Sequence, residues 1–192
     1  MRNPVTRRDA LILGLSTGTV LAAPTVLRAQ TVPETQPETT PRNISSFQMQ
    51  DWRDHFDSLG KATVVADTGS KALHYWNEDG TDYRIYPTSV PRTDELTKRG
   101  YTQIVRKKVG PSWTPTASQM ERFPDWKPIP PGPENPLGTH AMYLSWPAYI
   151  IHGTHDTRKI GRASSDGCIG LYNVMIEELF ALCPVGTQVR VI

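Results

Sequence analysis

Three short runs of β-branched and aromatic residues follow closely on one another, at residues 62–66, 72–76 and 83–86. The sequences Asp-Thr-Gly-Ser and Asn-Glu-Asp-Gly, which favour tight turns, separate them. Neighbouring parallel strands need a crossover of a dozen or more residues, and these connections are too short for that. The spacing therefore predicts antiparallel strands in an all-β core, with one or two helices at its periphery.

The rest of the chain continues this pattern. Four more strands are predicted, at residues 101–109, 139–146, 148–152 and 188–192. The stretch 110–136 between them is rich in Pro and Trp and has no steady period, so it is predicted to be an irregular surface loop. A loop of this length in a small domain is usually functional.

Two segments have the spacing of helices. Met49, Trp52, Phe56 and Leu59 recur at helical intervals, which predicts a short amphipathic helix at residues 48–59. A second helix is predicted at residues 173–183, just before Pro184.

The first 29 residues resemble an export signal. Arg7 and Arg8 precede a moderately hydrophobic run at residues 10–27, which favours a twin-arginine signal peptide and a periplasmic protein. A retained membrane anchor is the alternative, although the run is short and interrupted for a spanning helix. Residues 30–47, rich in Thr, Pro, Glu and Gln, are predicted to be a flexible linker to one domain at 48–192, with no stable membrane span after processing.

The charge of the mature chain excludes one class of partner. The whole chain has 21 Lys and Arg against 19 Asp and Glu. Four of these basic residues and one acidic residue lie in the first 29, so the remainder carries 17 basic and 18 acidic side chains. A net charge of −1 gives no basis for binding nucleic acid or an anionic membrane.

The chain has two cysteines, which in an exported protein could form a disulfide. Their settings differ, because Cys168 lies between glycines in a loop whereas Cys183 ends an apolar helical run. We therefore expect Cys183 to be a small buried hydrophobic residue and Cys168 to carry chemistry.

The segment Ser-Ser-Asp-Gly-Cys-Ile-Gly-Leu around Cys168 has a histidine, His152, sixteen positions upstream. A cysteine attacks carbonyls as a thiolate, so it needs a base such as His152 to take its proton. Gly167 lets the backbone turn so that the amides of Gly167 and Cys168 can form an oxyanion hole. The carbonyl of Gly153 is the expected acceptor for the other ring nitrogen of His152.

Two alternatives to this interpretation remain. Each residue taken alone could be a buried structural residue. His152, His155 and Cys168 could also be zinc ligands, although a fourth ligand at useful spacing is missing.

The segment resembles the catalytic signature of L,D-transpeptidases with the YkuD-like domain, in which a His-Gly pair precedes a Ser-x-Gly-Cys-Ile block. Further similarity lies in the motifs Gly-Pro-Glu-Asn-Pro-Leu-Gly at 132–138, Ala-Met-Tyr-Leu at 141–144, Ile-Gly-Arg-Ala at 160–163 and the closing run 184–192. The resemblance spans about residues 61–192. It implies the mainly β sandwich or barrel of the L,D-transpeptidase catalytic domain, with one or two peripheral helices.

The same resemblance implies a function. Cys168 would be the nucleophile and His152 its base, supported by Gly167, Gly153, Ser165 and Asp166. The cysteine would attack the carbonyl of the third residue of a peptidoglycan stem tetrapeptide, expel D-alanine and form a thioester that a second stem's amine resolves. No cofactor or metal is implied. Carbapenem-type inhibitors are known to acylate such enzymes, and the family also attaches proteins to the wall.

Two positions depart from the family pattern. Gly170 stands where relatives usually carry Arg or Asn, and Asp166 replaces the usual His or Ser. An aspartate there opposes thiolate formation unless a cation pairs with it, a role that Arg162 or Arg158 could take. We interpret these changes as altered substrate geometry, with an acyl acceptor or cross-link other than the common 3-3 type.

Other interpretations of the site remain open. Arg158, Arg162 and Tyr143 are the expected substrate-binding residues, although Tyr143 could instead belong to the core. A hydrolase of stem peptides and a non-catalytic wall-binding module are the alternative functions.

Overall fold

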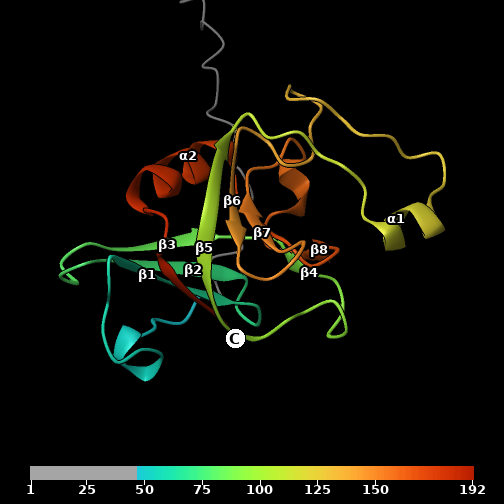
Figure 1. Ribbon diagram of the computed structural model, residues 1–192. Helices are drawn as coiled ribbons and strands as arrows, with labels where there is room; N and C mark the ends of the chain where they lie inside the picture. Colours follow the sequence, from blue (N-terminus) through green and yellow to red (C-terminus); the bar gives the residue numbers. More distant parts are fainter. Residues whose placement is uncertain (1–46) are drawn as a thin grey trace, which may run out of the picture. The chain divides into compact units, whose positions relative to one another are not determined.

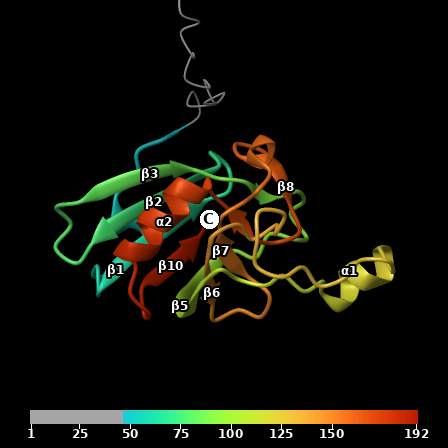
Figure 2. The same ribbon diagram turned by 90° about the horizontal axis from the view of Figure 1, so that it is seen from above.

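The computed structural model describes residues 47–192. The predicted signal peptide (1–29) and all but the last residue of the predicted linker (30–47) lie outside these residues. The described part folds around a curled sheet, shown in Figures 1 and 2.

Ten strands and a few short helical segments follow one another along the chain. The strands are β1 (Ala62–Asp67), β2 (Ala72–Asn77), β3 (Tyr83–Pro87), β4 (Val90–Pro91), β5 (Gly100–Val109), β6 (His140–Leu144), β7 (Ile150–His152), β8 (Ala163–Ser165), β9 (Ile169–Gly170) and β10 (Gln188–Val191). The helices are α1 (Ala117–Arg122) and α2 (Asn173–Leu182), with 3-10 turns at Trp52–Asp54 and Thr157–Lys159.

Eight strands form one mixed sheet in the order β3-β2-β1-β10-β5-β6-β7-β9. Most neighbours are antiparallel, as expected, but the pairs β1–β10 and β7–β9 are parallel. The long strand β5 belongs to both halves, because its first residues pair with β10 and its later residues with β6. A register shift between Ile104 and Arg106 lies at this change of partner, and irregularities of this kind increase the local twist of a sheet.

Helix α2 covers one face of the sheet near β2, β3 and β10 (Figure 2). Its Ile176 and Leu179 are fully buried in the main core, together with Leu73, Met142 and Val189 from the strands. Cys183, just after the helix, is also fully buried and is a free thiol, which confirms the prediction of a small buried hydrophobic residue.

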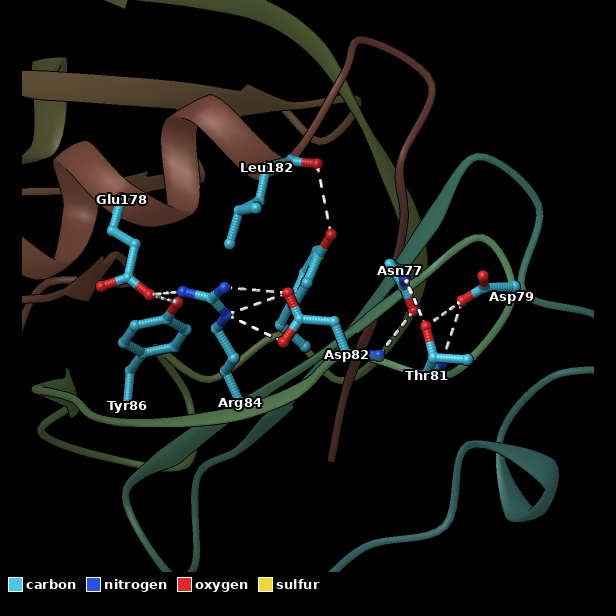
Figure 3. A network of polar contacts seen from close by, with 9 residues as sticks. Asn77, Asp79, Thr81, Asp82, Arg84, Tyr86, Glu178 and Leu182 are labelled. Atoms are coloured by element: carbon cyan, nitrogen blue, oxygen red, sulfur yellow. Dashed lines mark hydrogen bonds and ion pairs between the residues drawn. The ribbon is translucent and has the colours of Figure 1, made fainter.

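A polar network fastens α2 to β3 at the rim of this core (Figure 3). Glu178 of the helix pairs with Arg84 and accepts a hydrogen bond of 3.0 Å from the hydroxyl of Tyr86. Arg84 also pairs with Asp82 at 2.9 Å. These groups are partly exposed, so we attribute the position of the helix mainly to its buried apolar face.

The predicted helix at residues 48–59 is wrong. The segment holds only the 3-10 turn Trp52–Asp54, where the Asp51 carboxylate accepts from the Arg53 amide at 3.0 Å. Trp52 and Phe56 pack against a small cluster beside the sheet, while Met49 is 75% exposed. Capping by Asp51 and this packing favour a tight turn over a continued helix.

The predicted structureless loop at 110–136 contains helix α1, so that prediction is wrong in part. The Thr116 hydroxyl accepts from the Gln119 amide, and the Gln119 side chain accepts from the Thr116 amide at 2.9 Å. This capping box has the sequence pattern Thr-x-x-Gln, a helix-start signal that was readable in the sequence. The mainly β class with peripheral helices is confirmed.

Candidate active site

Cys168 lies in the turn between β8 and β9. Gly167 before it has a φ of 126°, a backbone conformation that side-chain-bearing residues rarely adopt. The Ser165 hydroxyl donates to the Cys168 carbonyl at 2.5 Å and accepts from the Gly167 amide at 3.4 Å. This closed turn fixes the backbone on which the sulfur is carried.

A second set of contacts holds this turn from the outside. The amide of Ser89 donates to the Gly170 carbonyl at 2.8 Å, and the Gly170 amide donates back to Ser89 at 3.2 Å. The amide of Arg92 donates to the Ser165 carbonyl at 3.0 Å. The segment around β4 therefore binds the nucleophile turn at both of its ends.

His152 ends β7, the strand beside β9. The two strands run parallel, and His152 pairs with Gly170, two residues after Cys168. Continuing the strand spacing over these two residues gives a Cα separation of about 8 Å between His152 and Cys168. Both side chains line the same cavity. That separation lets an imidazole and a thiol meet.

The ring of His152 is oriented by the backbone. Its Nδ1 donates to the carbonyl of Gly153, the acceptor expected from the sequence. The proton therefore sits on Nδ1, and Nε2 is the free, basic nitrogen. An imidazole held in this tautomer can accept a proton from the cysteine.

Burial sets the resting ionisation of the pair. Desolvation lowers the pKa of His152 to about 4, although its contact with Gly153 acts in the opposite direction. Desolvation also raises the pKa of the Cys168 thiol to about 11. In the resting state the thiol of Cys168 donates a weak hydrogen bond to the carbonyl of Ala148, at 3.5 Å. At neutral pH both partners are thus uncharged, and His152 is in the form that a general base requires.

Both residues line a cavity of about 850 Å³. One wall comes from the loop that carries α1, through Trp113, Gln119, Phe123 and Trp126. The other walls come from the sheet and the nucleophile turn, through Arg106, Tyr143, Tyr149, Ile150, Ser165 and Asp166. The cavity is large enough for a short peptide and contains aromatic and polar groups together.

Asp166 is held by cations that the sequence did not single out. It pairs with Arg92 from beside β4 and, at 3.1 Å, with Arg122 from α1, and it accepts from Gln119 at 3.0 Å. Its negative charge beside the cysteine is therefore neutralised. The same contacts join α1 to the nucleophile turn.

The predicted counter-charges Arg158 and Arg162 lie elsewhere. Arg158 pairs with its neighbour Asp156 at 2.8 Å and its side chain is 85% exposed. Arg162 is also exposed, and neither residue lines the cavity. Tyr143 does line it, beneath the guanidinium of Arg106. No local pattern pointed to Arg92 or Arg122, because both reach Asp166 from distant parts of the chain.

Close packing leaves little space at two of the glycines singled out from the sequence, Gly153 and Gly170. A Cβ atom on Gly153 would lie 2.3 Å from Asn173 Oδ1 at the start of α2. A Cβ atom on Gly170 would lie 2.5 Å from the hydroxyl oxygen of Ser89. The absence of a large side chain at position 170 is thus built into the contact with the β4 segment.

The zinc alternative finds no support in the described part of the chain. Residues 47–192 contain no group of three or more His, Cys, Asp or Glu side chains that could hold a metal ion. His155 instead lines a separate cavity of about 490 Å³ beside Trp113 and Trp126.

Residues 61–191 match the L,D-transpeptidase catalytic domain family, also called YkuD. The chain belongs to this family. A putative L,D-transpeptidase from Fuscovulum blasticum is 69% identical over the whole of both chains. The probable L,D-transpeptidase ErfK/SrfK of Escherichia coli K12 is 35% identical over 71% of this chain. The match covers only 45% of the length of that longer relative.

Solved structures show the same fold. L,D-transpeptidase 3 from Mycobacterium tuberculosis superposes with a TM-score of 0.54 at 16% identity, over 69% of this chain and 61% of that one. LdtMt1 in complex with imipenem superposes with a TM-score of 0.55 at 16% identity, over 69% of this chain and 59% of that one. These likenesses support the curled β sheet of the family as the fold of this domain.

Proposed function

We propose that this protein is a peptidoglycan L,D-transpeptidase that transfers a stem-peptide acyl group through a thioester on Cys168. The single observation that supports this most is the Cys168–His152 pair in one cavity of a domain that belongs to the family. The tautomer of His152, with Nε2 unprotonated, agrees with its role as base.

The reaction follows from the resting state of the pair. His152 Nε2 takes the thiol proton as the sulfur bonds to the attacked carbonyl carbon. The C–N bond then breaks, and the imidazolium returns the proton to the departing amine. An amine of a second stem attacks the thioester, loses a proton to His152, and releases the thiol. No external reductant, oxidant or metal is needed.

The supporting roles are assigned to the turn before the cysteine. We assign the oxyanion hole to the amides of Gly167 and Cys168, on the turn that Gly167 allows. The Gly167 amide donates to the Ser165 hydroxyl at 3.4 Å in the resting turn, so it exchanges this partner for the oxyanion. Ser165 keeps the turn closed, and the Gly153 carbonyl keeps the imidazole oriented.

Arg158 and Arg162, assigned to substrate binding from the sequence, stay a prediction. Substituting Gln for Arg162 tests it, with Arg99→Gln, an exposed arginine paired to Asp94, as the matched control.

The cross-link is proposed to differ from the common 3-3 type. Gly170 leaves no room for the cation that relatives carry there, and the cations near the cysteine come instead from Arg92 and Arg122. We expect the acceptor to be the amino-terminal amine of another stem. Product analysis with defined stems that yields only 3-3 dimers would reject this proposal.

Export to the periplasm by a twin-arginine signal is also proposed, on the basis of Arg7, Arg8 and the apolar run after them. Within residues 47–192, no helix is long and apolar enough to cross a membrane. Replacing both arginines by lysine should retain the protein inside the cell, and fractionation measures this directly.

Acylation by carbapenems is expected because the Cys168 sulfur would attack their carbonyl carbon as it attacks that of the stem peptide. One solved structure of similar fold holds imipenem, and another is an avibactam carbamoyl enzyme. A carbapenem adduct that maps to Cys168 would exclude a non-catalytic wall-binding module.

The decisive experiment compares muropeptides from cells that express wild type or Cys168→Ala. Cross-linked dimers that depend on Cys168 support transfer. Shortened stems without new dimers would instead support a hydrolase, and identical profiles would reject both.

A further inference from the structure

Arg106 is a cation in the cavity that has no acidic partner. It lies on β5 and is exposed, and no carboxylate within residues 47–192 pairs with it. Arg92, in contrast, is occupied by Asp166. The cavity also holds Lys159, so its free charge is positive. A cavity of this kind favours an anionic ligand.

The register of the sheet places Arg106 in line with the nucleophile. Arg106 is opposite Tyr143 on β6, and Tyr143 is opposite Ile150 on β7. β7 and β9 pair in parallel from Ile151 and Ile169 onward, and continuing this register back by one residue brings Ile150 level with Cys168. All four residues line the cavity, and Figure 1 shows β5, β6 and β7 side by side.

The guanidinium of Arg106 stacks on its cross-strand neighbour Tyr143. Its Cζ atom lies 3.4 Å from the centre of the Tyr143 ring. Tyr143 thereby fixes the plane of the guanidinium by stacking. Two strand spacings of ~4.8 Å separate the backbone of Tyr143 from that of Cys168, and three separate the backbone of Arg106 from it, so the guanidinium lies about 10–14 Å from the cysteine backbone.

This separation bears on which carboxylate of a donor peptide the guanidinium meets. The carboxylate of the departing residue stays within about 4 Å of the attacked carbonyl carbon, because successive backbone units are that far apart. A separation of about 10–14 Å favours a carboxylate that lies farther from the attacked carbon. Such a carboxylate belongs to the retained acyl part of the donor, either on the side chain of the third residue or on the second residue.

We propose that Arg106, stacked on Tyr143, binds a carboxylate of the retained part of the donor stem and so selects donors that carry one. The proposal rests on the proposed function for the identity of the donor. Arg106 acts as a specificity residue and takes no part in bond making. Its planar fork of N–H donors matches a carboxylate in a bidentate contact.

Binding to Cys168→Ala protein tests this without requiring turnover. Isothermal titration calorimetry would measure the Kd of tetrapeptides with free carboxylates, with the third-residue side-chain carboxylate amidated, and with the second-residue carboxylate amidated. The Cys168→Ala protein would be compared with three double variants that add Arg106→Gln, Arg106→Lys or Lys108→Gln to it. Lys108→Gln, on the same strand, is the matched control.

Arg106→Gln should weaken binding of the free peptide about 10–100-fold, as expected for losing a charge-assisted bidentate contact. Amidation of the carboxylate that Arg106 binds should weaken binding by the same factor. Arg106→Gln combined with that amidated peptide should bind no more weakly than either change alone. Arg106→Lys should keep part of the affinity, and Lys108→Gln all of it. The amidation arm that shows this coupling identifies the carboxylate.

Equal weakening of free and amidated peptides by Arg106→Gln would overturn the proposal, as would no effect at all. Turnover by wild type is measured in parallel. If Arg106→Gln and amidation are coupled in binding but wild type shows no turnover, the proposed function is rejected and the carboxylate site stands. If wild type turns over and the two changes are not coupled, only the carboxylate site is rejected.

Discussion

The resting state of the catalytic pair yields a prediction about pH. The pKa values of about 11 for Cys168 and about 4 for His152 differ by about 7, which corresponds to roughly 10 kcal/mol against moving the proton from sulfur to nitrogen. Attraction between the resulting ions at ~4 Å returns only about 4 kcal/mol at an effective dielectric constant near 20. Several kcal/mol remain, so the pair should rest as neutral thiol and neutral imidazole.

Alkylation by iodoacetamide measures this directly, since the thiolate is the reactive form. With a pKa of about 11, roughly one thiol in 3,000 is ionised at pH 7.5. The second-order rate of Cys168 alkylation should therefore increase about tenfold for each pH unit from 7 to 10. The experiment uses the Cys183→Ala variant, so that a single thiol is followed by mass spectrometry.

A rate that reaches a plateau between pH 5 and 7 would refute this reasoning, because it would reveal a preformed thiolate–imidazolium pair. Thiolate absorbance at neutral pH that disappears in His152→Ala would refute it equally. If the pair rests uncharged, substrate binding must precede ionisation, and His152 stays basic down to about pH 4.

Three further predictions concern the structure around the site. Gly170→Ala should destabilise the fold by about 1–3 kcal/mol in urea unfolding through overpacking against Ser89, and a second change, Ser89→Ala, should restore most of the loss. Asp166→Asn should lower the free energy of unfolding by under ~1 kcal/mol, because the ion pairs of Asp166 are partly exposed. Amide hydrogen exchange in α1 should nevertheless accelerate, and unchanged exchange would show that these ion pairs do not hold α1. The fully buried His74 has a pKa lowered to about 4 by desolvation, so the unfolded state binds a proton that the folded state excludes, and stability should fall by about 3 kcal/mol from pH 6.5 to 4. Wild type and His74→Phe compared at both pH values should differ in this slope.

The strands and α2 could be predicted because their signals are local. Periodic apolar residues and turn sequences indicated β1, β2, β3 and β5 within a residue or so. The short strands β4, β8 and β9 have two or three residues each, too few for any period to appear. Their pairing with distant segments creates them.

The reactive pair could be predicted from the sequence for a similar reason. Cys168 and His152 lie in short motifs whose glycines indicate tight turns, and the resemblance to a family added to that. The cations around Asp166 could not be predicted, because Arg92 and Arg122 are far from it in sequence and meet it only after folding. Nearby arginines such as Arg158 were the natural candidates, but local pairing with Asp156 turns that side chain to solvent.

The central claim is that the sulfur of Cys168 becomes covalently bound to the donor. Intact-protein mass spectrometry after mixing the protein with a stem tetrapeptide, without any acceptor, tests it most directly. We expect an added mass equal to the donor minus its terminal residue, located at Cys168 by peptide mapping, present in Cys183→Ala and absent in Cys168→Ala. An adduct that persists in Cys168→Ala, or that maps to another residue, would contradict the thioester mechanism.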